Sequence, residues 1–345
     1  MLPYLHRIDD ARWYSNFGPL LMDLERRLAE RFQGAALTVT GVNATQMLAL
    51  TLKAMDLPAG GLCMMPAWTF VATAQAVVEA GLVPYFVDVD PSTWMLDPET
   101  ATEMLHAAPE RVCAVVAVSA FGAMPDIKRW EAFREATGTP VLIDAAAAFD
   151  AACDARLPLV VSLHATKVLG IGEGGYLASH DAELVDRVRQ STTFGFRGGR
   201  ESLRLGTNAK LNEYAAAVGH AALDAWPASR LRYLRAAQLL RMAFTGAPQV
   251  SFQPGWGADW VTSVCMVRLP DGATAEVERA LNGEGVDTRR WWGDGCHRSP
   301  VFADCPRGPL TSTELLARST LGLPFAVDLD EAACSQIAGA VGRAI

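Results

Sequence analysis

The stretch VLIDAAAAFDAACDARLPLVVSLHATKVLGIGEGG, residues 141–175, decides the fold of this chain. It holds two short apolar runs, residues 141–143 and 157–163, with small and polar residues between them. Apolar runs without polar alternation are typical of strands that are buried on both faces of a parallel sheet. The first run ends at Asp144, and Lys167 follows the second. The stretch therefore predicts two strands of an α/β sheet with ionisable side chains where the strands end.

The residues before this stretch repeat the alternation of apolar runs and helical segments. From Gly18 to Gln33 the leucines recur at helical spacing, which predicts an amphipathic first helix. Further apolar runs lie near residues 36, 62, 83 and 112, and helical segments lie at about 43–55, 70–80, 98–107 and 126–137. Single helices between buried strands indicate a mostly parallel sheet covered on both faces.

The residues after it predict a second, smaller lobe. A polar, Gly-rich segment at 194–210 is too charged to be core, and a long Ala-rich helical segment follows and continues beyond Pro227. The last third predicts strands near VSFQP and SVCMVRL, and helices near 273–283 and 328–343. We therefore expect a large domain at 1–227 and a small C-terminal α+β domain at 228–345.

Composition and charge exclude several classes of protein. Half of the 345 residues are apolar and one fifth are charged, which excludes a disordered or collagen-like chain. The net charge of −8, from 38 acidic and 30 basic residues, gives no electrostatic footprint for a nucleic-acid partner.

The cysteines and the N-terminus indicate a cytoplasmic protein. Seven cysteines are scattered, mostly in apolar runs, which predicts reduced core thiols, and no Cys/His spacing typical of a metal site occurs. Charged residues Arg7, Asp9 and Asp10 stand where a signal peptide needs an apolar core. No apolar run approaches the roughly 18 residues of a membrane span.

Asp144 and Lys167 together predict a pyridoxal 5'-phosphate site. Taken alone, Asp144 also fits a strand-end aspartate that caps the next turn. Lys167, however, stands in a segment with almost no other charge, and a lysine in dry surroundings becomes an amine nucleophile toward aldehydes. Pyridoxal phosphate needs a lysine that binds its aldehyde as a Schiff base and an aspartate that keeps its pyridine nitrogen protonated.

The residues around Lys167 fit the phosphate of this cofactor. Ser162 and Thr166 offer hydroxyl groups, and the following glycines allow close backbone approach. Gly170, Gly172 and Gly175 also match the G-x-G-x-x-G pattern of dinucleotide sites. Because a strand-like segment follows instead of a helix, we do not expect a dinucleotide site, and an NAD-dependent sugar enzyme would rest on this pattern alone.

Five collinear segments carry a resemblance to a known family. They are RWYSNFGPL (12–20), PAWTFVATAQAVVEAGLVPYFVDVD (66–90), VLIDAAAAFDA (141–151), SLHATKVLGIGEGG (162–175) and GTNAKLNEYAAAVG (206–219). In this order the chain resembles the DegT/DnrJ/EryC1/StrS family of sugar aminotransferases. The resemblance continues more weakly through GVDTRRWWGDGCHRSPVF and LGLPF in the last third.

The resemblance implies a fold and an activity. The fold would be that of a fold-type I, aspartate aminotransferase-like enzyme, with a large, mostly parallel seven-stranded sheet domain and a small C-terminal domain. The family acts as homodimers with active sites at the subunit interface. Its members transfer an amino-acid nitrogen to nucleotide-linked keto sugars.

The resemblance also implies roles for individual residues. Lys167 would be the Schiff-base lysine and general acid/base, Asp144 the partner of the pyridine nitrogen, and Phe70 the ring that stacks on the cofactor, with Trp68 a weaker candidate for that face. Ser162 would bind the phosphate. The family usually has Gly-Thr where this chain has Asn43, Ala44 and Thr45, which are also ordinary residues at the start of a helix but can still hold a phosphate there.

A further residue is implied to act across the subunit interface. Asn208 matches the asparagine that reaches the phosphate bound by the partner subunit, so a monomer would be inactive. Lys210 stands where an arginine is common in the family, and a lysine lacks the planar fork of arginine.

Two departures from the family pattern concern the neighbourhood of Asp144. Ala147 and Phe149 stand where members often carry Gln and His, so ring contacts from those side chains are absent or replaced. The hairpin between the aspartate and the lysine is also shortened.

For the substrate the expectations are less direct. Trp13 and Tyr14 near the start, and Arg290 and His297 in the last lobe, are candidate substrate contacts, together with Arg289 and Trp292. A lone histidine such as His297 is more often structural. The WWGDGCH segment resembles members that act on 4-keto-6-deoxyhexoses.

We therefore expect amination of a dTDP-linked 4-keto sugar with L-glutamate as donor, making an amino-deoxysugar for glycans such as lipopolysaccharide O-antigen or for natural products. The alternatives are a 3-keto-sugar aminotransferase, a sugar dehydratase of the same family, and a non-catalytic regulator that binds the cofactor. Dehydratases resemble the family but carry histidine in place of the lysine, so Lys167 argues against that alternative.

Overall fold

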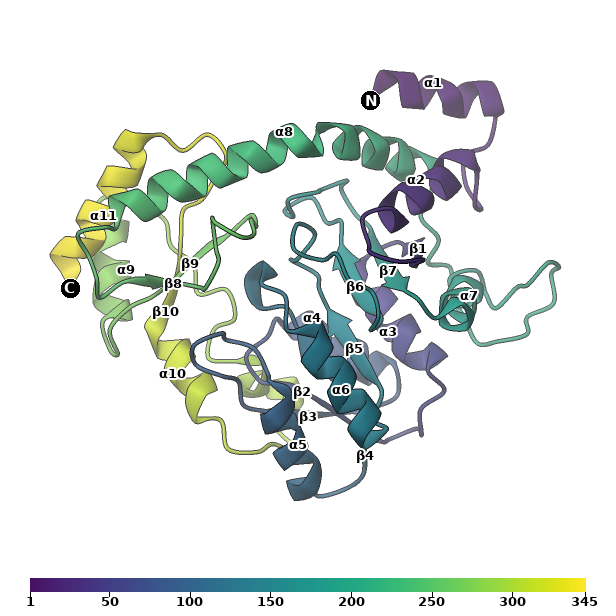
Figure 1. Cartoon of the computed structure of the whole chain (residues 1–345), viewed down its shortest axis with the longest axis horizontal. Helices are drawn as coiled ribbons and strands as arrows, with labels where there is room; N and C mark the ends of the chain where they lie inside the picture. Colours follow the sequence, from purple (N-terminus) through teal and green to yellow (C-terminus); the bar gives the residue numbers. More distant parts are fainter.

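A seven-stranded sheet forms the centre of the large lobe in the computed structural model, which describes residues 1–345 (Figure 1). The strand order is β1-β7-β6-β5-β4-β2-β3. Only β7 runs antiparallel to its neighbours β1 and β6, and the remaining pairs are parallel. The strands are β1 (Leu37–Gly41), β2 (Leu62–Pro66), β3 (Val83–Val87), β4 (Val112–Val118), β5 (Val141–Asp144), β6 (Leu159–Ser162) and β7 (Gly175–Ser179). The predicted α/β fold with a mostly parallel sheet is confirmed.

Helices cover both faces of this sheet. One apolar core contains residues of α2, α5, α6 and the first part of α8, and a second contains residues of α3, α4 and α7. The helices of the large lobe are α1 (Leu2–Ala11), α2 (Pro19–Ala29), α3 (Ala44–Ala54), α4 (Val71–Glu79), α5 (Pro98–Ala107), α6 (Ile127–Thr137) and α7 (Ala182–Ser191), with a 3₁₀ turn η1 (Ala120–Gly122). Strands β2, β4, β5 and β6 are buried along their whole length, which explains their unbroken apolar runs.

The last third of the chain forms a smaller α+β lobe. Its antiparallel sheet has the order β10-β9-β8, and its core is a third apolar cluster. Its elements are β8 (Ser251–Phe252), β9 (Cys265–Arg268), α9 (Thr274–Gly283), η2 (Cys296–Arg298), η3 (Pro300–Phe302), α10 (Thr311–Ser319), β10 (Thr320–Leu323) and α11 (Glu331–Ala344).

Helix α8 (Glu213–Ala243) joins the two lobes. It runs from the side of α2 in the large lobe to α11 in the small lobe (Figure 1). Pro227 lies inside this helix, so the expected domain boundary after residue 227 falls within one continuous element. The two lobes are therefore joined by one continuous helix and not by a flexible linker.

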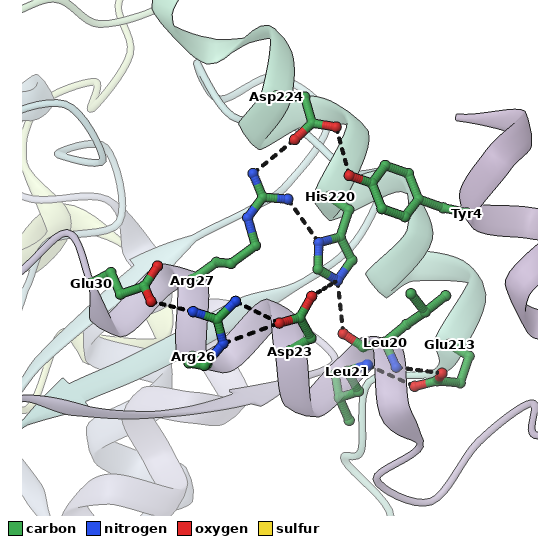
Figure 2. A network of polar contacts seen from close by, with 10 residues as sticks. All are labelled: Tyr4, Leu20, Leu21, Asp23, Arg26, Arg27, Glu30, Glu213, His220 and Asp224. Atoms are coloured by element: carbon green, nitrogen blue, oxygen red, sulfur yellow. Dashed lines mark hydrogen bonds and ion pairs between the residues drawn. The ribbon is translucent and has the colours of Figure 1, made fainter.

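A polar network fixes the N-terminal helices α1 and α2 on α8 (Figure 2). The buried carboxylate of Glu213 accepts hydrogen bonds from the backbone N–H groups of Leu20 and Leu21, at 2.9 and 2.8 Å. On the same helix, buried His220 meets the carbonyl oxygen of Leu20 and the guanidinium of Arg27, each at 2.9 Å. The two Glu213 contacts satisfy N–H donors at the first turn of α2 that no helical carbonyl can reach.

All seven cysteines are free thiols, and five of them are buried, as the apolar runs predict. None of the helices is both long and apolar enough to cross a membrane.

Candidate active site

A cavity of about 640 Å³ lies at the carboxyl ends of the central strands, between the two lobes. Neighbouring parallel strands β5 and β6 end at the same edge of the sheet, and their last residues, Asp144 and Ser162, both line the cavity. The large lobe also contributes Asn43, Ala44, Thr45, Phe70, Thr73, Phe121, His164, Lys167 and Glu173, and the small lobe contributes Thr262, Ser263, Val264, Arg289, Trp291 and Trp292.

Asp144 is held rigidly at the buried end of the cavity. Its Oδ2 accepts a hydrogen bond of 2.7 Å from the Thr73 hydroxyl, and its Oδ1 accepts one of 3.1 Å from the Ala146 N–H. The side chain is almost inaccessible to water, and this burial raises the pKa of the carboxyl, although the two hydrogen bonds and Lys167 favour the charged form. Such a carboxylate is poised to pair with a cationic group in the cavity.

Lys167 enters the cavity from the turn that follows β6. Its backbone N–H donates to the His164 carbonyl, at 2.9 Å, and no hydrogen bond or ion pair holds its Nζ. Desolvation lowers the pKa of the ammonium, while the charge of Asp144 opposes the shift. A lysine with a lowered pKa is more often a neutral amine, which is the form that reacts with an aldehyde.

The turn itself depends on glycine. A Cβ on Gly170 would lie 2.5 Å from the Ala165 carbonyl oxygen, so a side chain there would displace the turn that carries Lys167.

Hydrogen-bond donors also line the cavity, at the start of α3 and the end of β6. Helix α3 begins after Asn43, whose side chain accepts from the Gln46 N–H at 2.8 Å, so the N–H groups of Ala44 and Thr45 stay free at the helix N-terminus. The Ser162 hydroxyl accepts from the His164 N–H at 3.2 Å and keeps its own proton for donation. A Cβ on Gly175 would lie 2.6 Å from the Ala44 nitrogen, so only glycine leaves the N-terminus of α3 free at the cavity.

The arrangement fits pyridoxal phosphate. One cavity is lined by a buried carboxylate that suits the pyridine nitrogen, an amine without a partner that suits the aldehyde, and N–H and hydroxyl donors that suit the phosphate. Phe70, at the start of α4, lines the cavity with more than half of its side chain exposed, as a stacking ring must be before a ligand covers it. Trp68, by contrast, is buried against Phe121 and Trp292 and does not line the cavity.

The small-lobe wall carries an arginine without an ionic partner. Arg289 lines the cavity, its guanidinium lies 5.1 Å from the centre of the Trp291 ring, and it forms no ion pair. Its backbone exchanges two hydrogen bonds with Gly322, of 3.0 and 2.8 Å. A smaller cavity of about 370 Å³ adjoins and shares Ser263, Val264, Arg289 and Trp291 with the main one.

Two candidates from the small lobe are not brought to the cavity. Arg290 pairs with Glu278 at 3.0 Å and does not line the cavity, whereas Arg289, the neighbouring candidate, does. His297 is buried beside Phe86, and neither ring nitrogen has a partner. A histidine enclosed in this way packs the lobe and does not meet a ligand in this cavity.

Four other candidates lie outside the cavity of their own chain. Trp13 donates from its indole nitrogen to the Ser15 carbonyl at 2.6 Å, and exposed Tyr14 stacks on Tyr214. Lys210 donates to the Asn208 side chain at 2.5 Å. All four residues are accessible on the surface or beside it, where a second subunit can bury them.

The two departures near Asp144 leave different traces. Ala147 lines the cavity and adds only a methyl group there. Phe149 is buried away from it, packed edge-on against Trp226 and beneath the Arg31 guanidinium, which lies 3.9 Å from the ring centre. The ring contact of a histidine at this position is therefore replaced by core packing.

Sequence reasoning missed Thr73 and Phe121. Thr73 lies one helical turn after Phe70, so the spacing within TFVAT puts both at the start of α4 and was the available signal. Phe121 has a left-handed backbone, with φ of 53°, and no local pattern indicated it.

Comparisons with known proteins identify the family. A sequence model of the DegT/DnrJ/EryC1/StrS aminotransferase family matches residues 1–342. The UDP-2-acetamido-2-deoxy-3-oxo-D-glucuronate aminotransferase of Pseudomonas aeruginosa is 29% identical over 336 residues, covering 94% of this chain and 90% of that one.

Two solved structures share the fold. A Bacillus cereus protein assigned to the PLP-dependent aminotransferases superposes with a TM-score of 0.92 at 27% identity, covering 99% of this chain and 95% of that one. The structure of DesI with its TDP-sugar product gives a TM-score of 0.88 at 31% identity, covering 99% and 88%.

Proposed function

Because the chain belongs to the DegT/DnrJ/EryC1/StrS aminotransferase family, and is thus a pyridoxal-phosphate-dependent aminotransferase, we propose that it aminates a nucleotide-linked keto sugar. The observation that carries the proposal is the meeting of Lys167 and Asp144 in one cavity that is also walled by the small lobe. We also propose that the domain at 1–227 binds the cofactor and that residues within 228–345 form the substrate-binding wall of the cavity.

The cofactor, when bound, supplies an aldehyde that accepts the amino group and a ring that withdraws electrons. Lys167 Nζ, whose pKa desolvation lowers, would take the α-proton from the donor and pass it to the carbon that had carried the aldehyde oxygen. Asp144 holds the proton on the pyridine nitrogen, and Thr73 holds Asp144. Ser162 and the N–H groups of Ala44 and Thr45 bind the phosphate.

The acceptor proposal rests on the relatives and on the small-lobe wall. One relative is named for a UDP-linked 3-oxo sugar, and a similar structure holds a TDP-sugar product. Arg289 offers a fixed, unpaired cation between the main and the adjoining cavity, where an anionic linker of a nucleotide sugar would pass. We assign the substrate as a dTDP-linked 4-keto-6-deoxyhexose, with the 3-keto sugar as the alternative, and L-glutamate as the donor.

We also propose a homodimer with shared active sites. Asn208 and Lys210 lie outside the cavity of their own chain, in a segment that exposes large apolar side chains. Phe194, Leu203 and Leu205 are 46%, 59% and 92% exposed. Exposed apolar residues of this size indicate a protein interface, which would bring Asn208 to the phosphate of the partner.

The test is a direct assay with isotope-labelled glutamate. Purified protein with pyridoxal phosphate is incubated with dTDP-linked 4-keto and UDP-linked 3-keto sugars, and mass spectrometry follows the label. Transfer of label to the 4-keto sugar is the expected result. Transfer only to the 3-keto sugar selects the alternative, and loss of water from the sugar without label indicates a dehydratase.

A further inference from the structure

A buried carboxylate, Asp150, joins the two lobes beside the cavity. Its side chain is 4% exposed and lies in the turn after β5. Oδ1 accepts a hydrogen bond of 2.7 Å from the Arg230 Nε on α8, and Oδ2 accepts one of 3.0 Å from the Val261 N–H. One side chain thus connects three segments that are far apart in the sequence.

The two chain segments that Asp150 joins both contribute residues to the cavity lining. On one side, the turn that carries Asp150 begins at Asp144 and contributes Ala146 and Ala147 to the lining. On the other side, Val261 is the first residue of the wall segment, which we define as residues 261–264. The other three residues of this segment, Thr262, Ser263 and Val264, line the cavity. Asp150 itself does not line it.

The wall segment is held by few polar contacts. At its far end the Val264 carbonyl accepts from the Trp256 indole N–H at 3.1 Å, within the small lobe. Towards the large lobe, the Asp150 contact with Val261 is its only hydrogen bond. Thr262 is merely packed there, against the site of Gly122, where an added Cβ would lie 3.1 Å from the Thr262 Cβ.

The contact is also needed for the buried backbone. Val261 is 1% exposed and belongs to the apolar core of the large lobe, so water cannot replace Asp150 as the acceptor of its N–H. A buried donor without a partner destabilises the folded chain, and the chain relieves this by moving the donor toward water. For Val261, such a movement pulls the wall segment away from the turn after β5.

We propose that Asp150 is a positioning residue that sets the distance between the wall segment and the cofactor side of the cavity, and with it the affinity for the keto sugar. The inference rests on the proposed function for the identity of that substrate. The amino donor is smaller than the nucleotide-linked sugar and needs less of the cavity, and Asp144 and Lys167 keep their own contacts. The affinity for the sugar therefore depends on Asp150 more than the rate of the chemical steps does.

The test compares Asp150→Ala, Asp150→Asn and Arg230→Met with the wild type. We expect Asp150→Ala to raise KM for the keto sugar by about tenfold, which corresponds to a loss of about 1.4 kcal/mol. We expect kcat and the spectral change with glutamate alone to stay within about threefold of wild type. Asp150→Asn keeps an acceptor for Val261 and should fall between, as should Arg230→Met, which removes only the cation.

Glu25→Gln is the matched control. Glu25 is also a carboxylate that is 4% exposed, and it pairs with Arg189 at 2.6 Å and accepts the Thr40 N–H at 2.8 Å. It belongs to α2, and its side chain contacts Arg189 and Thr40 instead of the wall segment. Replacing Glu25 should lower the melting temperature, while the KM for the keto sugar relative to the KM for glutamate stays as in wild type.

A second measurement does not depend on turnover. Hydrogen exchange followed by mass spectrometry should show faster exchange at 261–264 in Asp150→Ala and no change there in Glu25→Gln. Unchanged exchange at 261–264 overturns the Asp150 proposal, and this result needs no turnover of sugar. Absence of turnover in the wild type contradicts the proposed function instead, so the two failures can be told apart. Faster exchange with an unchanged KM for the sugar also overturns it, because Asp150 is then only structural.

Discussion

The ring of Trp292 stacks on the ring of Phe121, with their centres 3.8 Å apart and their planes 18° apart. The two residues come from different lobes, and both line the cavity. The contact closes the cavity between β4 and the small-lobe wall. It therefore joins the two lobes at the cavity.

Replacing Trp292 should weaken substrate binding more than the chemistry. We expect Trp292→Ala to raise KM for the sugar several-fold, because a removed ring leaves the cavity open to water on that side. A double-mutant cycle with Phe121→Ala should give a coupling of about 0.5–1.5 kcal/mol in the free energy of unfolding. Trp226→Leu is the control, since Trp226 packs on Phe149 inside the large-lobe core, and it should lower stability without changing KM. An equal rise of KM in both variants contradicts the prediction.

Lys167 should be the lysine that binds the cofactor. The chain has four lysines, Lys53, Lys128, Lys167 and Lys210, so borohydride reduction followed by peptide mass spectrometry identifies the labelled residue without ambiguity. Lys167→Ala should lose at least about 10³-fold in turnover, because the attachment and the proton transfer go together. Lys53→Ala, whose side chain is on the surface near Glu79, is the control with normal turnover. Label on another lysine would refute the assignment.

Asp144→Asn should lose activity and gain stability in the cofactor-free protein. Burial raises the pKa of this carboxyl, so the folded state binds its proton more tightly than the unfolded chain does. Its contribution to stability is full at low pH and is lost as the pH rises through the raised pKa. An amide escapes this loss, and it can still accept from Ala146 and donate to the Thr73 hydroxyl, which in turn reaches Thr69 at 3.0 Å.

Thermal melts of cofactor-free protein check this prediction. The melting temperature of Asp144→Asn should exceed that of wild type at about pH 8, and the difference should shrink as the pH is lowered toward about 4. A variant that is less stable than wild type at every pH would show that the carboxylate is a net stabilising group.

His220 should make stability depend on pH through the network of Figure 2. Its Nε2 must carry the proton, because the Leu20 carbonyl only accepts, and its Nδ1 must be bare, because the Arg27 guanidinium only donates. Burial, Arg27 and Arg7 lower its pKa, against the Leu20 carbonyl and Asp23, whose carboxylate lies 3.8 Å from Nε2. The stabilisation is therefore fully present above the ordinary histidine pKa of about 6.5 and is lost as the pH falls from that value through the lowered pKa of the folded state.

The melting temperature measured across this range gives the check. The drop on acidification should be smaller in His220→Leu, which cannot be protonated, while exposed His106→Gln should keep the wild-type slope. Tyr4, which stacks on His220 at 4.9 Å and donates to Asp224, stays in place in both variants. The same slope in His220→Leu as in wild type would assign the pH effect to other groups.

Asn208 should act in the partner's active site. Lys167→Ala and Asn208→Ala homodimers should each be impaired, and mixing them after dissociation should restore activity. A hybrid dimer then contains one site with both residues intact and one with neither. Absence of recovery, with hybrids shown by native mass spectrometry, would place Asn208 outside the site.

The sequence predicted the strand ends better than the walls of the cavity. Asp144 and Ser162 end unbroken apolar runs, and parallel strands bring such ends together, so that edge of the sheet follows from local pattern. The wall depends on single-residue choices that pattern does not encode. Arg289 and Arg290 are adjacent, yet only Arg289 is held to the cavity by its backbone pairing with Gly322, while Glu278 draws Arg290 away.

One other difference has its physical cause in a long-range contact. His297 was a candidate because of its sequence neighbours, but Phe86 encloses it. Helix α8 continues through Pro227, as the sequence predicts, because packing of α8 on α2 and α11 outweighs the one lost backbone hydrogen bond of proline.

The pairing of β1 with β7 has a consequence for how the protein is made. Leu37 pairs with Ser179, so an early segment waits unpaired at the ribosome until a much later one emerges, on the order of ten seconds at typical rates of synthesis. The donors at Ala44 and Thr45 follow β1 directly, and Gly175 begins β7. The phosphate end of the site is thus the last part of the sheet to assemble during translation. The cofactor therefore gains its phosphate site only after β7 has left the ribosome and paired with β1.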